Sequence, residues 1–235
     1  MIKIIREIRK HLLDNGSTRS YLKYAIGEIA LVVIGILIAL QINNWNEAYK
    51  NARMEKSYLI NLQQDLTSDL VRLDELKTNF EKAVKSKDFL VSVINSESGR
   101  SDSLGVNFRN LSSFVTDFIP NKTTMDELKN SNGLYLISNP ELRRQIVTLY
   151  NTYDDFVAKL KLGNEKAQFI LVYTSKYIKK ITESTDAEVS ELIKDYSFNN
   201  LIRMNYLFTQ LDICSKAFYN CVITLDQVKK EIELC

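Results

Sequence analysis

An apolar stretch, AIGEIALVVIGILIALQI, occupies residues 25–42 with only Glu28 and Gln41 as polar residues, and decides how the rest of the chain is interpreted. It carries no polar side chain from Ile29 to Leu40. At a rise of about 1.5 Å per residue, a helix of this length is just long enough to cross a bilayer. A hydrophobic helix buried in a soluble protein is the less favoured alternative. The sequence therefore predicts a transmembrane anchor over residues 20–46.

Aromatic residues flank this stretch on both sides: Tyr21 and Tyr24 precede it, and Trp45 follows it. Such rings favour the two membrane interfaces, and the 21 steps from Tyr24 to Trp45 span about 31 Å of helix. A cleaved signal peptide would need a shorter apolar core and a small-x-small cleavage site. The sequence QINNW at 41–45 offers no such site, so we predict an uncleaved signal-anchor.

Basic residues are unevenly distributed around the predicted span. Six Lys or Arg residues precede it, and three lie in the twenty residues after Ile42. The positive-inside rule then places the N-terminus in the cytoplasm. We therefore expect a single-pass protein of the inner membrane, with residues 47–235 forming an extracytoplasmic domain that is periplasmic in a Gram-negative cell.

Residues 1–19 are predicted to form a cytoplasmic, basic amphipathic helix. In IKIIREIRKHLL, residues 2–13, the Ile and Leu side chains recur at helical spacing between Lys and Arg, as in helices that lie on a lipid surface. The single histidine, His11, falls on the polar margin of this helix. Residues 51–235 carry a net charge of −1, so we expect the lipid bilayer as a partner and no nucleic acid.

The extramembrane sequence predicts an all-α fold. No Gly or Pro interrupts the chain between Gly35 and Gly99, so one helix could run from the membrane to about Asn95. Two apolar series at sevenfold spacing follow the span, as in helix bundles and coiled coils. Their members are Leu59, Leu66, Leu73, Phe80 and Ile94, and Leu62, Leu76, Ala83 and Leu90.

Two further long helices are expected after an insert at about 98–137. The insert would hold short helices around Val106–Phe118 and from Thr124, where a hydroxyl precedes Glu127 by three residues in a capping-box pattern. Asn139-Pro140 then restarts a long helix that reaches about Ile181, and the last helix runs from about Phe198 to the C-terminus. We expect an antiparallel three-helix bundle in which the second long helix returns and the third runs outward again.

The sequence predicts no catalytic residue, cofactor or metal site. A Ser-His or Cys-His mechanism needs a histidine that the extracytoplasmic part lacks, and the Glu-x-x-His pairs of a di-iron bundle are missing. The acids Asp65, Asp69, Asp74 and Glu75 have the spacing of a solvated helix surface. Cys214 and Cys221 are expected as buried small side chains, whereas the terminal Cys235 could be exposed; their redox state is left open.

Glu28 is the one ionisable residue inside the apolar stretch, where such groups are costly and often functional. Glu28, Gly35 and Ala39 share one side of a helix, and Gly35 and Ala39 form a small-xxx-small pair of the kind that lets two helices approach closely. We expect this side to serve helix association or an intramembrane function. The alternative is an acid whose side chain extends to the cytoplasmic interface.

Two segments resemble an uncharacterised family of single-span inner-membrane proteins of Bacteroidota, known as a domain of unknown function. They are YAIGEIALVVIGILIALQINNWNE, residues 24–47, and TTMDELKNSNGLYLISNPELRRQIVTLYNTY, residues 123–153. The resemblance extends loosely over the whole chain and implies a helical extracytoplasmic domain. It implies no activity.

From these features we expect a non-enzymatic, membrane-anchored helical protein that acts by partner binding or by self-association. Its partner would be a second copy or another membrane protein. The main alternative is an accessory subunit of an ion-driven inner-membrane complex that uses Glu28. A periplasmic ligand-sensing bundle is a weaker alternative, because only about 24 residues remain on the cytoplasmic side.

Overall fold

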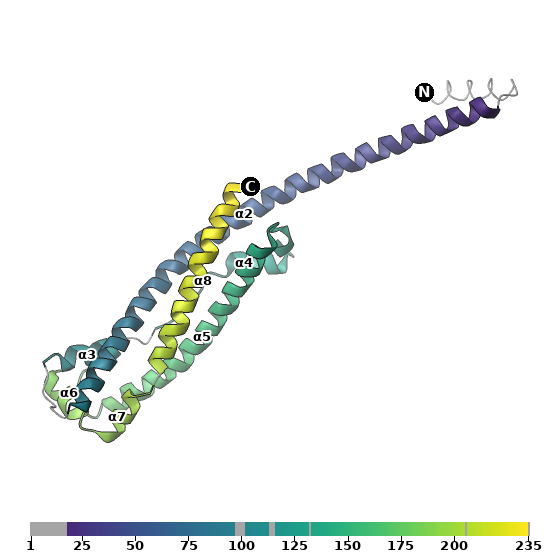
Figure 1. The fold of residues 1–235 in the computed structure, drawn as a ribbon. Helices are drawn as coiled ribbons and strands as arrows, with labels where there is room; N and C mark the ends of the chain where they lie inside the picture. The colour runs from purple at the N-terminus through teal and green to yellow at the C-terminus, as the bar shows by residue number, and fades with distance from the viewer. Residues whose placement is uncertain (1–17, 97–101, 113–115, 132, 205, 235) are drawn as a thin grey trace. The chain divides into compact units, whose positions relative to one another are not determined.

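The protein is described here from a computed structural model covering residues 18–96, 102–112, 116–131, 133–204 and 206–234 (Figure 1). The described residues are almost entirely helical and contain no strand, which confirms the all-α prediction. The amphipathic helix expected over residues 1–19 lies outside the described residues apart from its last two positions. The chain divides into two compact units, Met1–Met54 and Glu55–Cys235.

The first unit is described through one helix, α2 (Thr18–Asn95), which continues into the second unit. From Ile26 to Ile42 the apolar side chains of this helix are all exposed, for example Leu31 at 74 % and Leu37 at 59 %. Exposed apolar side chains on this scale are unfavourable in water and favourable in a lipid bilayer. Within the described part of the chain, α2 alone is long and apolar enough to cross a membrane.

The second unit adds two long helices and several short ones to the remainder of α2. Its elements are α3 (Leu104–Ser112), α4 (Thr123–Asn130), η1 (Gly133–Leu136), α5 (Pro140–Thr174), η2 (Ile181–Glu183), α6 (Asp186–Leu192), α7 (Tyr196–Ile202) and α8 (Tyr206–Leu234). The expected insert is thus formed by α3, α4 and η1.

Three expected helix boundaries are wrong. The helix expected to reach Phe118 ends at Ser112, and Phe118 packs in irregular backbone against Tyr153 with ring centroids 5.2 Å apart. Helix α5 ends at Thr174 rather than at about Ile181. The single last helix is divided into α7 and α8, without a Gly or Pro to signal the break.

The core of the second unit is built on the apolar series of α2. Leu59, Leu66, Leu73 and Phe80 are at most 1 % exposed, and Ile94 is half-buried against the same core. The companion series, Leu62, Leu76, Ala83 and Leu90, is buried as well. Burying each such Leu or Phe stabilises the fold by roughly 1.5–3 kcal/mol, so the sevenfold spacing identifies the side of α2 that holds the bundle together.

Side-chain hydrogen bonds fix the direction of the long helices in the second unit. Four of those that join α8 to its neighbours run from Cys214 to Leu73, from Cys221 to Leu66, from Gln210 to Lys159 and from Asn220 to Thr152. Residue numbers rise on one helix as they fall on the other, so α8 is antiparallel both to α2 and to α5.

It follows that α5 runs parallel to the body part of α2. The expected order, with the second long helix returning, is therefore wrong in direction. The chain returns instead through the irregular segment 116–122, which lies along α2. There Arg72 Nη1 donates to the Ile119 carbonyl at 3.0 Å. Helix α5 then starts beside Glu55, whose carboxylate accepts from the Ser138 N–H at 2.6 Å.

Candidate functional site

The residues predicted to act within the membrane lie on one exposed side of α2, here called the span face. It comprises Glu28, Val32, Gly35, Ala39 and Ile42, which fall within about 80° of the helix circumference. All five are exposed in the structure. A Cβ atom added at Gly35 would meet nothing within 4 Å, so the space over this glycine is open.

The predicted interface anchors also belong to α2. Tyr24 and Trp45 are 63 % and 78 % exposed, so both rings are available to an interfacial environment. Tyr21 lies in the first turns of the same helix.

The span face offers a surface of small residues and one carboxylate, rather than a reaction centre. Gly35 and Ala39 are one turn apart, so a second helix could approach this stretch of backbone closely. Glu28 lies two turns from Gly35, about 10 Å along the axis. This arrangement can support helix packing, with the carboxylate able to accept a hydrogen bond from a neighbouring chain.

In the second unit, two of the acids expected on the surface of α2 are instead hydrogen-bonded to the insert. Asp69 is fully buried, and its carboxylate accepts from the Asn121 N–H at 3.0 and 3.2 Å. Asp65 accepts from the Thr124 N–H at 3.3 Å and from the Thr124 hydroxyl at 2.6 Å. The surface assignment is wrong for the buried Asp69 and holds only in part for the half-buried Asp65, whereas Asp74 and Glu75 are exposed as expected.

These bonds also correct the expected start of α4. Thr124 lies inside the helix, and its hydroxyl bonds to Asp65 rather than to the helix's own backbone, so the capping box with Glu127 does not form. The Asp65 carboxylate thus satisfies a backbone donor in the first turn of α4 from another helix, which is electrostatically favourable at a helix N-terminus.

Asn121 connects three parts of the bundle through its backbone. Its N–H donates to Asp69 on α2, and its carbonyl accepts from the Tyr150 hydroxyl on α5 at 3.0 Å. Burial raises the pKa of Asp69 to about 6, although the Asn121 N–H and the Arg72 charge oppose the shift. Burial likewise raises the pKa of Tyr150, which keeps its hydroxyl protonated as a donor.

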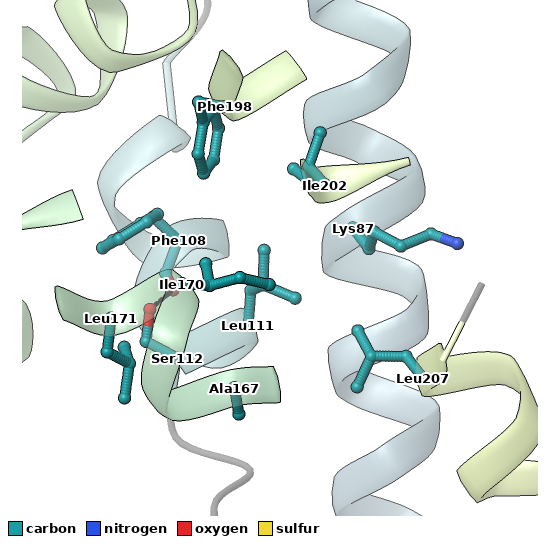
Figure 2. A pocket seen from close by; sticks show the side chains of 10 residues that line it. All are labelled: Lys87, Phe108, Leu111, Ser112, Ala167, Ile170, Leu171, Phe198, Ile202 and Leu207. Atoms are coloured by element: carbon teal, nitrogen blue, oxygen red, sulfur yellow. Dashed lines mark hydrogen bonds between the residues drawn. The ribbon is translucent and has the colours of Figure 1, made fainter. Parts of the chain in front are cut away.

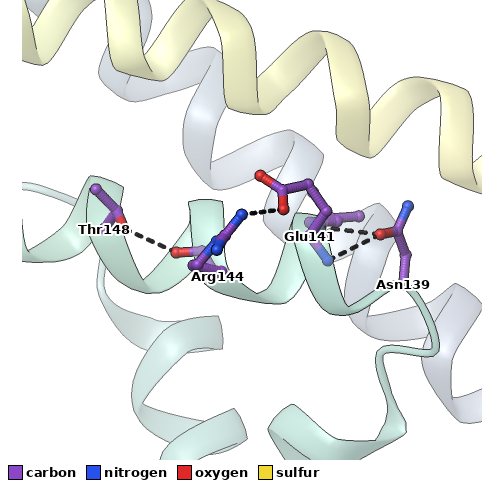
Figure 3. A network of polar contacts seen from close by, with 5 residues as sticks. Asn139, Glu141, Arg144 and Thr148 are labelled. Atoms are coloured by element: carbon purple, nitrogen blue, oxygen red, sulfur yellow. Dashed lines mark hydrogen bonds and ion pairs between the residues drawn. The ribbon is translucent and has the colours of Figure 1, made fainter.

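The start of α5 is held by a second polar network (Figure 3). The Asn139 side chain accepts from the N–H groups of Glu141 and Leu142 at 3.0 and 3.2 Å, as the predicted cap requires. Its amide nitrogen donates to Glu231 of α8 at 2.8 Å. Arg144 pairs with Glu141 one turn further along the helix. The network joins the beginning of α5 to the end of α8 and has the character of a structural cap.

A small apolar cavity of about 20 Å³ lies between α2, α3, α5, α7 and the beginning of α8. Phe108 and Phe198 line it, and the aliphatic part of Lys87 covers one side while its ammonium points away from the apolar side chains (Figure 2). This volume is room for about one water molecule. The cavity is therefore a packing imperfection rather than a site for an organic ligand.

The described residues contain no group of three or more His, Cys, Asp or Glu side chains placed to hold a metal ion. Cys214 and Cys221 are buried and free, as expected for the first two cysteines, while Cys235 lies outside the described residues. Burial raises the pKa of the Cys214 thiol to about 12 and that of Cys221 to about 11, so neither is a reactive thiolate at neutral pH.

Residues 28–210 match a protein family described as "Family of unknown function (DUF6090)". The chain belongs to this family. The match begins at Glu28 of the span face and ends at Gln210 in α8, so it covers half of the first unit and most of the second. No curated protein and no solved structure matches the chain.

Proposed function

We propose that this member of the DUF6090 family is a non-enzymatic, single-span protein of the inner membrane that acts by binding itself or another membrane protein through its span face. The observation that carries the proposal is the continuous exposure of the apolar part of α2, with open space over Gly35. In a bilayer, side chains of this kind are covered by lipid or by another helix, and small residues favour the helix.

The proposed orientation follows from the distribution of basic residues around the span. An N-in topology places the second unit, residues 55–235, in the periplasm. A reporter that is active only in the periplasm, fused after Cys235, is expected to be active, and the matching cytoplasmic reporter is expected to be silent. Activity of the cytoplasmic reporter alone would overturn both the orientation and the compartment.

The span face is tested by replacing Gly35 with leucine in the full chain. Gly35→Leu places a bulky side chain on the span face and is expected to reduce association in mild detergent, measured by cross-linking and by sedimentation. Gly27→Leu is the matched control, because Gly27 is also surrounded by open space but lies about 100° around the helix from Glu28. Equal behaviour of the two variants and the parent would rule out packing through this face.

The second candidate function is that of an accessory subunit in an ion-driven membrane complex, and the exposed carboxylate of Glu28 inside the span favours it. Glu28→Gln preserves the shape of the side chain and removes the titratable group. If Glu28 carries protons, the variant is expected to assemble normally but to lack the cellular function. If Glu28 only takes part in packing, the substitution is expected to have almost no effect. Proteins that co-purify with the full chain in mild detergent would identify the complex.

A further inference from the structure

The outward side of α8 carries large apolar side chains that the bundle leaves uncovered. Phe208, Tyr219 and Ile223 are 56 %, 56 % and 52 % exposed, and Leu234 is 82 % exposed. At 100° per residue these four positions fall within about 80° of the circumference, opposite the side that contacts α2 and α5. Together they form one line along the length of the helix.

Four charged residues lie between these apolar side chains on the same line: Asp212, Lys216, Asp226 and Lys230, all exposed. We call the eight residues the α8 stripe. Their order along the chain is apolar, acidic, basic, apolar, and then again apolar, acidic, basic, apolar.

We propose that the α8 stripe is a contact surface for a second copy of this chain, with the two α8 helices packed antiparallel around a two-fold axis at the level of position 221. In this register each residue lies opposite the one equally far on the other side of 221. An isologous contact of this kind must be self-complementary, because the same surface is used on both copies.

The charges satisfy this condition. Asp212 of one copy lies opposite Lys230 of the other, and Lys216 lies opposite Asp226, so four opposite-charge pairs form in the dimer. A parallel arrangement in register would instead place Asp against Asp and Lys against Lys. The charge order therefore selects the antiparallel arrangement.

The apolar residues satisfy the same register. Tyr219 lies opposite Ile223 at the centre, and Phe208 lies opposite Leu234 at both ends, so large apolar side chains meet in pairs. In the isolated chain, Lys230 pairs with Asp226 one turn away at 2.7 Å. Exposed pairs of this type contribute little, so their exchange for pairs between copies costs little.

This surface differs from the span face, on which the proposed function depends. Asn139 bonds to Glu231, and the neighbouring Ser138 bonds to Glu55, so the Glu55 end of the body lies level with the end of α8. In the antiparallel register the Glu55 ends of the two copies are about 20 residues apart along α8, or about 30 Å. Gly35 lies in the first unit and the whole α8 stripe in the second, so Gly35→Leu alters no residue of the α8 stripe.

Disulfide trapping in the full chain tests the register. All variants carry Cys235→Ser, and the buried Cys214 and Cys221 are retained. A mixture of Phe208→Cys and Leu234→Cys chains in mild detergent is expected to form a dimer linked between the two positions. Neither chain alone should cross-link, because each position is about 39 Å from its own copy along the helix. A link between two Phe208→Cys chains, or no link in the mixture, would overturn the proposal.

A charge exchange separates contact between copies from pairing within the helix. Asp212→Lys or Lys230→Asp alone places like charges opposite each other and is expected to weaken dimerisation about tenfold, measured by sedimentation. The double variant Asp212→Lys/Lys230→Asp restores opposite charges between copies and should restore the dimer. Within one helix the same double variant places the introduced lysine one turn from Lys216 and the introduced aspartate one turn from Asp226. Pairing within the helix therefore predicts that the double variant is worse than either single one.

Circular dichroism of each variant shows whether the fold is retained. If the double variant dimerises no better than the single ones while all are folded, the α8 contact is refuted. Gly35→Leu should leave the Phe208–Leu234 cross-link unchanged. If no Phe208–Leu234 cross-link forms while Gly35→Leu still reduces association, this inference is refuted and the proposed function stands.

Discussion

Asp69 is a carboxylate without solvent exposure, and burial raises its pKa to about 6. A carboxylate in the unfolded chain titrates near pH 4, so the folded state binds the proton more tightly. By linkage, the contribution of this group to stability is fully present below about pH 4 and is lost as the pH rises through about 6. The ionised carboxylate stays buried at neutral pH because both of its oxygens accept from the Asn121 N–H.

The first prediction is that Asp69→Asn removes this pH dependence. The amide oxygen still accepts from Asn121, and no proton is released between about pH 4 and 6. Denaturant unfolding of the full chain in detergent should show that the parent loses on the order of 2–3 kcal/mol from this group over that interval, whereas the variant does not. Asp74→Asn, at an exposed position, is the control and should follow the parent. Identical pH profiles for all three proteins would contradict the argument.

The position of Asp69 relative to the leucines of α2 indicates burial, which the spacing of the acids alone does not. Asp69 is three residues after Leu66 and four before Leu73, which places it on the apolar side of α2. An acid at such a position is buried only when a partner is available, and the partner is a backbone N–H about 50 residues away in the chain. Sequence spacing cannot identify that donor, because any backbone group of the insert could supply it.

At the scale of elements, the packing of α5 on α8 depends on one close approach. Gly163 and Gln210 meet so closely that a Cβ atom at position 163 would overlap the Gln210 side-chain amide. Gln210 is 4 % exposed, and its amide donates to the Lys159 carbonyl at 3.0 Å. The glycine is therefore required by the neighbouring helix rather than by its own backbone conformation.

The second prediction is that Gly163→Ala destabilises the protein by about 1–3 kcal/mol, because the added methyl group displaces the buried amide. Gln210→Ala removes the amide and its hydrogen bond, at a cost of about 0.5–1.5 kcal/mol. In the double variant the methyl group has room. The loss of stability in the double variant should therefore be smaller than the sum of the losses in the two single variants. Denaturant unfolding of the four proteins checks this, and simple additivity would show that the two residues do not meet.

Helix existence was predictable where a long periodic pattern carried it, as for α2 to Asn95 and for the restart at Asn139-Pro140. Helix direction was not, because periodicity identifies the buried side of a helix and says nothing of which way it runs. The connection between α2 and α5 is long enough for either direction. The break between α7 and α8 was missed because no Gly or Pro marks it in the sequence. It is accompanied by a hydrogen bond from Arg203 to Asn95, at the end of α2.

At the scale of the whole molecule, the two units place their apolar residues in opposite ways. In the first unit the apolar side chains of α2 are exposed, and in the second the core consists of residues from Leu59 onward. The span face could be predicted from the sequence because composition and spacing define it. The α8 stripe could not be separated from the core-forming side of α8 until the structure showed which residues are buried.

The last prediction is that residues 51–235, released from the span, fold as a soluble and predominantly helical domain. All residues of the buried core belong to this fragment, so removal of the span deletes no core contact. Circular dichroism should show a helical spectrum and a cooperative thermal transition. Leu73→Ala and Phe156→Ala, both at fully buried positions, should each cost about 2–5 kcal/mol, whereas Lys77→Ala, at a partly exposed position, should cost little. A disordered fragment would instead mean that the body is stable only when anchored or associated, since the intact core would then be insufficient to hold three long helices together.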